Sequence, residues 1–240
     1  MPLPRNNLYP DFNISRLSHI ELGVKDLEAS FAFYVETLGL QVTEKESDYI
    51  YLRGMEERGH HSVILKKSEE PTCNVLGYKV FDEEQLYKAE IYFNSKNINT
   101  KWIERPFQGK TLLTHDIHGI PIEFYYQMDR LPTIHQKYKL YNGVKPLRID
   151  HFNVFSINVD ESVKFYSDLG FRVTEYTEDE KSKKLWAAWM HRKGTVHDIA
   201  FTNGVGPRLH HVAFWVPTPM NIIHLLDVIT TTGYITNLER

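Results

Sequence analysis

The sequence repeats a long phrase, and this repeat limits the folds open to the chain more than any other feature. Each copy has an apolar strand with a histidine at its third position, a Phe-Tyr pair, a Leu-Gly pair and a Val-Thr-Glu segment. The first copy begins at Leu17 and the second at Ile149, so His19 and His151 hold equivalent places. A repeat of this length indicates a duplicated unit that packs against its own copy, and one copy then predicts what the other contains.

A polar lead at residues 1–14 precedes four weakly similar modules, each of which reads as a strand, a helix and further strands. Two modules fill residues 15–130, a polar linker fills residues 131–145, and two more modules fill residues 146–240. Because one module cannot bury its apolar face alone, we expect the modules to pair. The sequence therefore predicts an α+β fold of paired βαβββ modules in two domains.

Capping residues and apolar spacing predict the helices and strands of these modules. A first helix is expected at residues 27–37, and a second should begin at Asp82, with Gln85 three residues on as its capping partner. A last helix at residues 219–230 should end at Gly233, because glycine readily adopts the left-handed backbone of a helix end. Strands are expected at residues 18–24, 49–53, 61–65, 77–81, 151–155, 185–191, 197–202 and 209–215.

The fourth module is shorter than the repeat requires. The second module closes with a turn at Gly119 and a strand that carries Glu123. The fourth module begins near Leu209 and reaches Arg240 without a copy of that phrase. We therefore expect the last module to be incomplete, with three strands missing from the second domain.

Composition restricts the classes of partner. The formal net charge is −3, from 28 Lys and Arg against 31 Asp and Glu, with no long block of one sign. This balance argues against a nucleic-acid partner and favours a small molecule. No run approaches the roughly 18 apolar residues of a membrane helix, so no membrane segment is expected. The single cysteine, Cys73, excludes an internal disulfide and fits a reducing cytoplasm.

Two histidines hold equivalent places in the strands that open the modules of the second domain. Aligning residues 150–155 with residues 210–215 places His151 over His211. If the modules pair about a twofold axis, these imidazoles converge, and two imidazoles with one carboxylate form a face suited to non-haem Fe(II). A lone strand histidine is more often a hydrogen-bonded polar residue than a ligand, and His210 is an alternative to His211.

A third histidine and a second, broken set of ligands complete the candidates. His197 starts an expected strand and could exchange protons beside a metal near neutral pH, although a surface histidine fits that position equally well. In the first domain His19 matches His151, but Gly77 occupies the partner position, and Glu123 stands where a carboxylate ligand would lie. We therefore expect His19 and Glu123 to be structural remnants of a metal site.

The most specific phrases lie in the third module and at the start of the fourth. They are Val-Thr-Glu at residues 173–175, Ala-Ala-Trp-Met-His-Arg-Lys at 187–193, Thr-Val-His-Asp at 195–198, Gly-Pro-Arg-Leu-His-His-Val-Ala-Phe at 206–214 and Asn-Ile-Ile at 221–223. These phrases resemble type I extradiol ring-cleavage dioxygenases of the vicinal oxygen chelate superfamily. The likeness runs from about residue 17 to the last residue and implies the vicinal oxygen chelate, or glyoxalase-like, fold.

The resemblance also implies roles for single residues. It implies that His151 and His211 are metal ligands and that His197 is the acid–base residue beside the metal. The third ligand of the family is a glutamate, which is expected beyond residue 240. A site with two of its three ligands should hold Fe(II) more weakly and activate dioxygen less well.

The same resemblance implies a substrate site and a function. Asn153 and Trp189 would line the site, and Arg240 would hold the carboxylate tail of a substrate. The predicted function is cleavage by dioxygen of a catechol such as 3,4-dihydroxyphenylacetate at Fe(II), with Mn(II) as the alternative metal, in a cytoplasmic homo-oligomer. Two other functions stay open on this fold, a glyoxalase-like isomerase or lyase and a non-catalytic binding protein.

Overall fold

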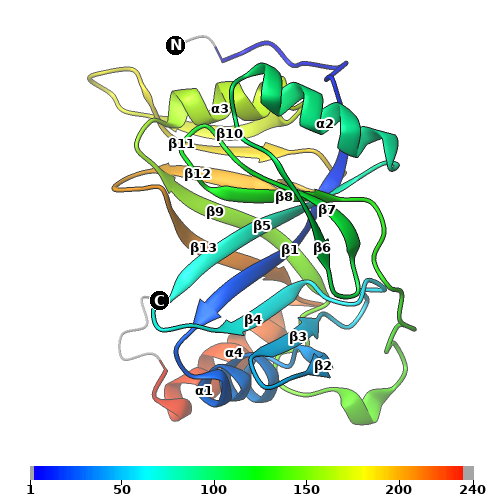
Figure 1. The fold of residues 1–240 in the computed structure, drawn as a ribbon. Helices are drawn as coiled ribbons and strands as arrows, with labels where there is room; N and C mark the ends of the chain where they lie inside the picture. The colour runs from blue at the N-terminus through cyan, green and yellow to red at the C-terminus, as the bar shows by residue number, and fades with distance from the viewer. Residues whose placement is uncertain (1–2, 235–240) are drawn as a thin grey trace. The chain divides into compact units, whose positions relative to one another are not determined.

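The structure is a computed structural model that describes residues 3–234 (Figure 1). The contacts cluster into two compact units, and each unit draws on three segments of the chain. Unit 1 takes residues up to Ile20 together with Cys73–Asp129 and Asp150–Ala213, and unit 2 takes Glu21–Thr72, Arg130–Ile149 and the residues from Phe214 onward. The predicted division into two two-module domains concerns repeats along the chain, and it stays a prediction.

Unit 1 contains two complete βαβββ modules with the same topology. In each, the first strand pairs in parallel with the last, and the middle strands continue outward in antiparallel order. The first module is β5 (Thr72–Val80), α2 (Glu84–Ser95), β6 (Lys101–Arg105), β7 (Gly109–His115) and β8 (Pro121–Tyr125). The second is β9 (Arg148–Ser156), α3 (Val159–Asp168), β10 (Arg172–Glu178), β11 (Leu185–His191) and β12 (Ile199–Asn203). The α+β fold with mixed sheets is thereby confirmed.

Two more strands flank these modules. β1 (Ile14–Val24) lies next to β5 and carries His19, whereas β13 (Arg208–Trp215) lies next to β9 and carries His211. The β1 residues up to Ile20 belong to unit 1, as do the β13 residues up to Ala213. Each histidine-bearing first strand of a predicted module therefore borders the first strand of another module.

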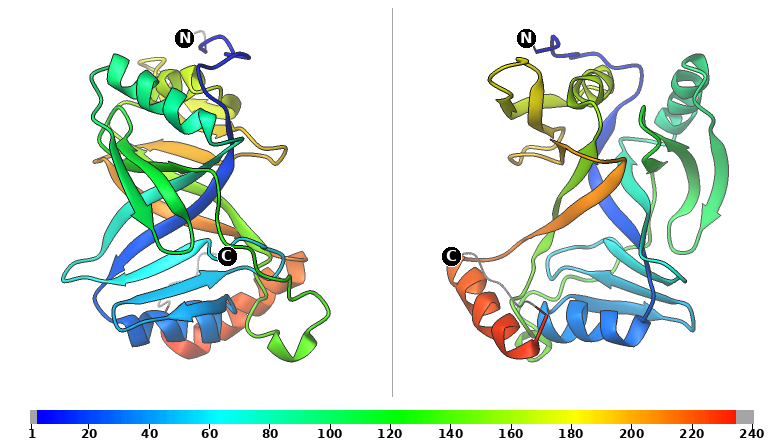
Figure 2. Two further views of the ribbon diagram at one scale, coloured as in Figure 1. Left: turned by 45° about the vertical axis from the view of Figure 1, so that its right-hand side comes forward. Right: turned by 90° about the vertical axis from the view of Figure 1, so that its left-hand side faces the viewer.

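Apolar side chains from α2, α3 and the strands form the core of unit 1. The helices lie side by side, with the rings of Phe93 and Phe165 6.2 Å apart between centroids (Figure 1). The ring of Phe124 on β8 is fully buried and lies 5.3 Å from that of Phe12. The α2 helix also lies against the β6–β7 hairpin (Figure 2), where the indole of Trp102 donates a hydrogen bond to Glu90.

Unit 2 consists of a small antiparallel sheet and short helices. Its strands β2 (Gln41–Lys45), β3 (Tyr49–Arg53) and β4 (Val63–Lys67) continue in that order to the end of β1. Its helices are α1 (Leu27–Phe31), a π-helix at Ala32–Thr37, a 3-10 turn at Tyr138–Leu140 and α4 (Pro219–Thr232). Among residues 3–234, no helix combines the length and the apolar character that a bilayer crossing requires.

Several element boundaries differ from those expected. The predicted helix at residues 27–37 changes to π-helical hydrogen bonding at Ala32, because the amide of Leu38 donates to the carbonyl of Phe33. The second helix has Glu83 rather than Asp82 as its N-cap, although the Asp82 carboxylate still accepts from the Gln85 amide. The expected end at Gly233 is confirmed by a φ of 77°.

Strand boundaries differ as well: β4 begins two residues later than expected and β5 five residues earlier, and two further differences lie near the site. β1 begins at Ile14, four residues earlier than expected and inside the predicted lead. β12 begins at Ile199, so His197 lies before the strand and does not start it. Because His197 lies outside the strand, the alternation of side chains along a strand does not predict which way its ring points.

We expect Phe124→Ala to lower the free energy of unfolding by about 3–5 kcal/mol, because the ring is fully buried and its removal leaves a cavity. Urea unfolding followed by circular dichroism measures the change. Ile91→Ala is the control, because that side chain is 69% exposed on α2 and its loss should cost less than about 0.5 kcal/mol. Equal costs for the two variants would contradict this placement of the core.

Candidate functional site

The structure brings the rings of His151 and His211 together from neighbouring strands β9 and β13. Their Nε2 atoms are 3.2 Å apart. The opposite nitrogens both have partners, because His151 Nδ1 lies 2.9 Å from the Asp150 carboxylate and His211 Nδ1 lies 2.8 Å from His210 Nδ1. Partners at Nδ1 fix the ring orientation and the tautomer, which is the usual arrangement around a histidine that binds a metal through Nε2.

The contacts of the two rings decide between the adjacent histidines. The structure turns His211 toward His151, whereas the ring of His210 lies 4.6 Å from that of Phe155. The role of His151 and His211 as metal ligands stays a prediction.

His197 lies beside this pair. Its ring centroid is 4.0 Å from that of His151, and neither of its buried ring nitrogens has a hydrogen-bond partner in the structure. Burial, followed by the charge of His151, lowers the pKa of His197 to about 4. A neutral imidazole at pH 7 has a lone pair that can accept a proton or a hydrogen bond. Such a ring can bind or move a proton of a ligand held next to His151.

Burial, followed by the charges of His151 and His210, also lowers the pKa of His211 to about 4. The neutral ring therefore persists at pH 7, and neutral imidazole is the form that binds metals. Two imidazole nitrogens about 2.1 Å from one metal, at angles of about 90–110°, lie about 3.0–3.4 Å apart. The observed 3.2 Å falls in that range, so the donor pair fits a metal ion.

The third donor is not found in the part of the chain that the structure describes. Among residues 3–234, no group of three or more His, Cys, Asp or Glu side chains is arranged to hold a metal ion. The glutamate ligand implied by the resemblance stays a prediction, and Arg240, predicted to bind the substrate, lies outside the described residues. The described chain thus supplies two nitrogen donors.

The two other predicted site residues lie on the same sheet. Asn153 of β9 pairs with Ala200 of β12, which pairs with Trp189 of β11, so these three residues form one row across the strands. Asn153 is two residues from His151 and therefore shares its face of the sheet. Asn153 is buried, and its side-chain oxygen accepts a hydrogen bond from Thr202. Their role in binding a substrate stays a prediction.

In the first copy of the repeat, the histidine binds a buried carboxylate of the same module pair. His19 Nε2 lies 2.8 Å from Glu123 Oε1, and both side chains are fully buried. The guanidinium of Arg105 lies 2.7 Å from the other oxygen of Glu123. A Cβ atom added at Gly77 would lie only 2.1 Å from the His19 ring, so glycine leaves the space that this ring fills. His211 holds the equivalent position in the second copy, and a histidine in place of Gly77 would collide with the ring of His19.

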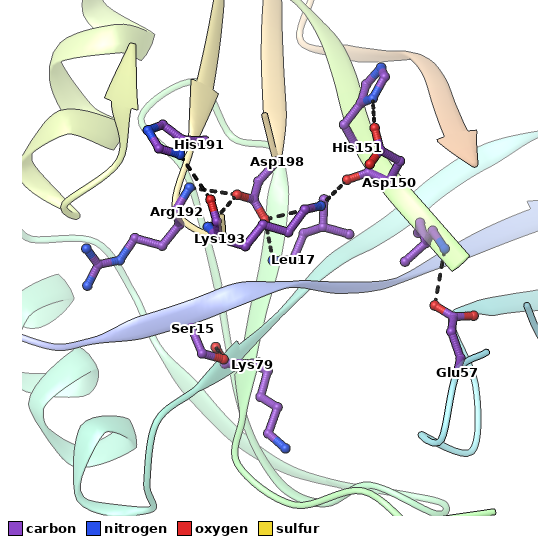
Figure 3. Close-up of polar contacts among 11 residues, drawn as sticks. Ser15, Leu17, Glu57, Lys79, Asp150, His151, His191, Arg192, Lys193 and Asp198 are labelled. Carbon is purple, nitrogen blue, oxygen red and sulfur yellow. Dashed lines mark hydrogen bonds and ion pairs between the residues drawn. The ribbon is translucent and has the colours of Figure 1, made fainter. Parts of the chain in front are cut away.

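Sequence reasoning missed the residues that support the histidines. Figure 3 shows Asp150, Lys193 and Asp198 linked to one another beside His151. The Asp198 carboxylate is fully buried and accepts hydrogen bonds from three backbone amides, of Leu17, Arg192 and Lys193. The only signal in the sequence was the aspartate next to each histidine, in Asp150-His151 and His197-Asp198.

The buried carboxylate of Glu123 should make stability depend on pH. Burial alone would raise the pKa of Glu123, but the hydrogen bond and charge of His19, with Arg105 and Gln108, lower it from 4.5 to about 2. A folded-state pKa below the unfolded value means that the stabilisation is present above the unfolded pKa and is lost as pH falls toward 2. The shift corresponds to about 3 kcal/mol near neutral pH.

We therefore expect Glu123→Gln to lower the free energy of unfolding by about 3 kcal/mol at pH 7 and to flatten its decline between about pH 5 and pH 2. Urea unfolding at a series of pH values measures both effects. Glu70→Gln removes a carboxylate from an exposed ion pair with Lys25 and controls for the change in net charge. A Glu123→Gln variant that keeps the wild-type pH dependence would show that this carboxylate is not the source.

Comparison with known proteins shows which family the chain belongs to. Residues 16–99 and 148–238 match the model of the Glyoxalase/Bleomycin resistance protein/Dioxygenase superfamily. The structure superposes on homoprotocatechuate 2,3-dioxygenase from Brevibacterium fuscum, solved with 3,4-dihydroxyphenylacetate, with a TM-score of 0.91 and 38% identity, over 100% of this chain and 75% of that one.

Two curated relatives are also ring-cleaving enzymes by name. A metapyrocatechase from Geobacillus stearothermophilus is 28% identical over 97% of this chain and 75% of its own length. A manganese-dependent 2,3-dihydroxybiphenyl 1,2-dioxygenase from Geobacillus genomosp. 3 is 26% identical over 90% of this chain and 73% of its own length. The fold, the extent of the match and the identity agree: the chain belongs to the extradiol dioxygenases of the Glyoxalase/Bleomycin resistance protein/Dioxygenase superfamily.

Proposed function

We propose that the protein opens the ring of a catechol such as 3,4-dihydroxyphenylacetate with dioxygen, next to the diol, to give a muconic semialdehyde. The observation that carries this proposal is the convergence of three imidazoles, with His151 and His211 3.2 Å apart at Nε2 and His197 against His151. The substrate class is supported by the solved relative that is 38% identical and holds 3,4-dihydroxyphenylacetate.

His151 and His211 would hold Fe(II), with Mn(II) as the alternative that the manganese-dependent relative supports. When bound, the ion would polarise the catechol oxygens and bring substrate and dioxygen to one place. The carboxylate of Asp150 holds the His151 ring through Nδ1, which leaves Nε2 directed at His211. The glutamate proposed as the third ligand is outside residues 3–234.

His197 would receive a proton from a catechol hydroxyl. Its pKa of about 4 keeps the ring neutral at pH 7, and its nitrogens have no hydrogen-bond partner in the structure that would compete for that proton. The proton would be returned as the ring opens, so the residue acts as acid and as base in one turnover. Both oxygen atoms of dioxygen enter the product, which balances the reaction without another oxidant.

The substrate would lie on the face of the sheet that carries His151, Asn153 and Trp189. The amide of Asn153 offers a donor toward an oxygen of the ligand, since its own oxygen is bound to Thr202. Arg240 is proposed to bind the carboxylate tail of the substrate. A cytoplasmic location and self-association also stay predictions.

Activity is tested by loading the purified protein with Fe(II), and separately with Mn(II), without oxygen. We expect oxygen uptake and a yellow product when 3,4-dihydroxyphenylacetate and air are added. His151→Ala should abolish both signals, because it removes one of the two nitrogen donors. A loaded protein that consumes no oxygen with this compound or with simpler catechols would contradict the proposal, and methylglyoxal–thiol adducts would then test the isomerase alternative.

Metal binding separates the ligands from the acid–base residue. We expect His151→Ala and His211→Ala to weaken Fe(II) or Mn(II) binding by at least about 100-fold, because each removes one direct donor. His197→Gln should bind metal within about threefold of wild type while losing about 100-fold or more in kcat, as a general acid–base residue would. Anaerobic calorimetry measures binding. His224→Ala, at an exposed position on α4, is the control for loss of a histidine.

A further inference from the structure

Two charged residues, Asp198 and Lys193, bind the backbone on either side of the histidine cluster. The Asp198 carboxylate is fully buried between β1 and the turn after β11. Its Oδ1 accepts from the Leu17 amide at 3.0 Å, and its Oδ2 accepts from the amides of Arg192 and Lys193 at 2.6 and 3.0 Å. Three amide donors stabilise the ionised carboxylate and leave it little freedom to move.

The backbone of Asp198 is held as firmly as its side chain. Its amide donates to the Met190 carbonyl at 2.8 Å, and its carbonyl accepts from the Phe152 amide at 3.0 Å. These bonds extend the pairing of β12 with β11 and β9 by one residue toward His197. His197 is therefore attached directly to the best-anchored residue of this region, while its own ring nitrogens are bound to nothing in the structure.

Lys193 links this anchor to His151. Its ammonium lies 3.6 Å from Asp198 Oδ1, and the same ammonium donates to the backbone carbonyl of Asp150 (Figure 3). The Asp150 carboxylate in turn accepts from His151 Nδ1 at 2.9 Å. The contacts therefore run without a break from the buried carboxylate of Asp198 to the ring of His151.

We propose that Asp198 and Lys193 are positioning residues that fix the spacing between His151 and His197. Asp198 is fixed next to His197, Lys193 binds the backbone carbonyl next to His151, and the contact between the ammonium and the carboxylate joins the two. Their hydrogen bonds act on the backbone that carries each histidine, at residues 192–193 and Leu17 for Asp198 and at Asp150 for Lys193. This proposal rests on the proposed function for its effect on turnover, but its geometric part stands without it.

The neighbouring Arg192 offers a matched control. Its guanidinium binds the carbonyls of Ile14 and Gly170 and the side chain of Asn13, at 2.9, 3.1 and 3.0 Å. It is thus a partly buried cation in the same turn, and its side chain binds Ile14, Gly170 and Asn13 rather than Asp150. Replacing either cation by methionine removes a charge and weakens the same turn, and only one replacement removes the link to Asp150.

The experiment compares Lys193→Met, Lys193→Arg and Arg192→Met. In the metal-free protein, ¹⁵N-labelled imidazole spectra report the tautomer and environment of each histidine, and variants of His151 and His197 assign the signals. We expect Lys193→Met to shift the signals of both rings and Arg192→Met to leave them in place, although both variants lower Tm. Lys193→Arg should return the signals toward wild type, because it restores a donor that can reach the Asp150 carbonyl.

In the metal-loaded enzyme, Lys193→Met should lower kcat by about 10- to 100-fold with KM within about twofold, the size typical of residues that orient catalytic groups. Arg192→Met should change kcat by less than about threefold. Unchanged histidine signals in Lys193→Met, with a loss of Tm equal to that of Arg192→Met, would show that the pair only stabilises the fold and would overturn the proposal. If Lys193→Met shifts the histidine signals but the metal-loaded wild-type protein turns over no catechol, the proposed function is contradicted and the positioning role stands.

Discussion

The parallel pairing of the first and last strands of a βαβββ module decides where the chemistry of this protein can lie. In the second module of unit 1 this pairing joins β9 to β12, with Phe152 opposite Ile199. The residues just before those two positions are therefore neighbours in space, although they are far apart along the chain. His151 and Asp198 occupy these positions, and His197 is the neighbour of Asp198 in the chain, so the register brings the rings of His151 and His197 to 4.0 Å between centroids.

The two copies of the repeat show two solutions to one electrostatic problem. A strand histidine in a protein interior needs a partner, because an unpaired polar group loses its hydration without compensation. In the first copy the partner is Glu123, and Arg105 neutralises the carboxylate. In the second copy His151 faces another imidazole and has its carboxylate partner at Nδ1. The first arrangement satisfies its charges internally, whereas the second directs two nitrogen donors at one point.

Membership of the extradiol dioxygenase family agrees with this difference between the copies. The family match covers both copies of the repeat, yet only the second has the converging histidines. Gly77 explains why the first copy is filled, since any larger side chain there would collide with the ring of His19. Both copies thus have the fold, and one of them has the converging histidines.

Periodicity and the internal repeat were enough to predict the α+β class, the βαβββ order and the convergence of the strands that carry His151 and His211. These features are local or repeated, so a pattern of apolar residues encodes them. The sequence could not show that His197 lies before β12, because that strand begins where its residues pair with β9 and β11, at Ile199.

The sequence by itself determined which residues could carry chemistry, because His151 and His211 hold equivalent places in the repeated strands. Only the tertiary structure decided which of them converge and what holds them. Lys193 and Asp198 are five residues apart, and Leu17 comes from a distant strand, so no periodic pattern marks them as partners. Their contact arises from the packing of three strands, which is a property of the folded chain and not of any one segment.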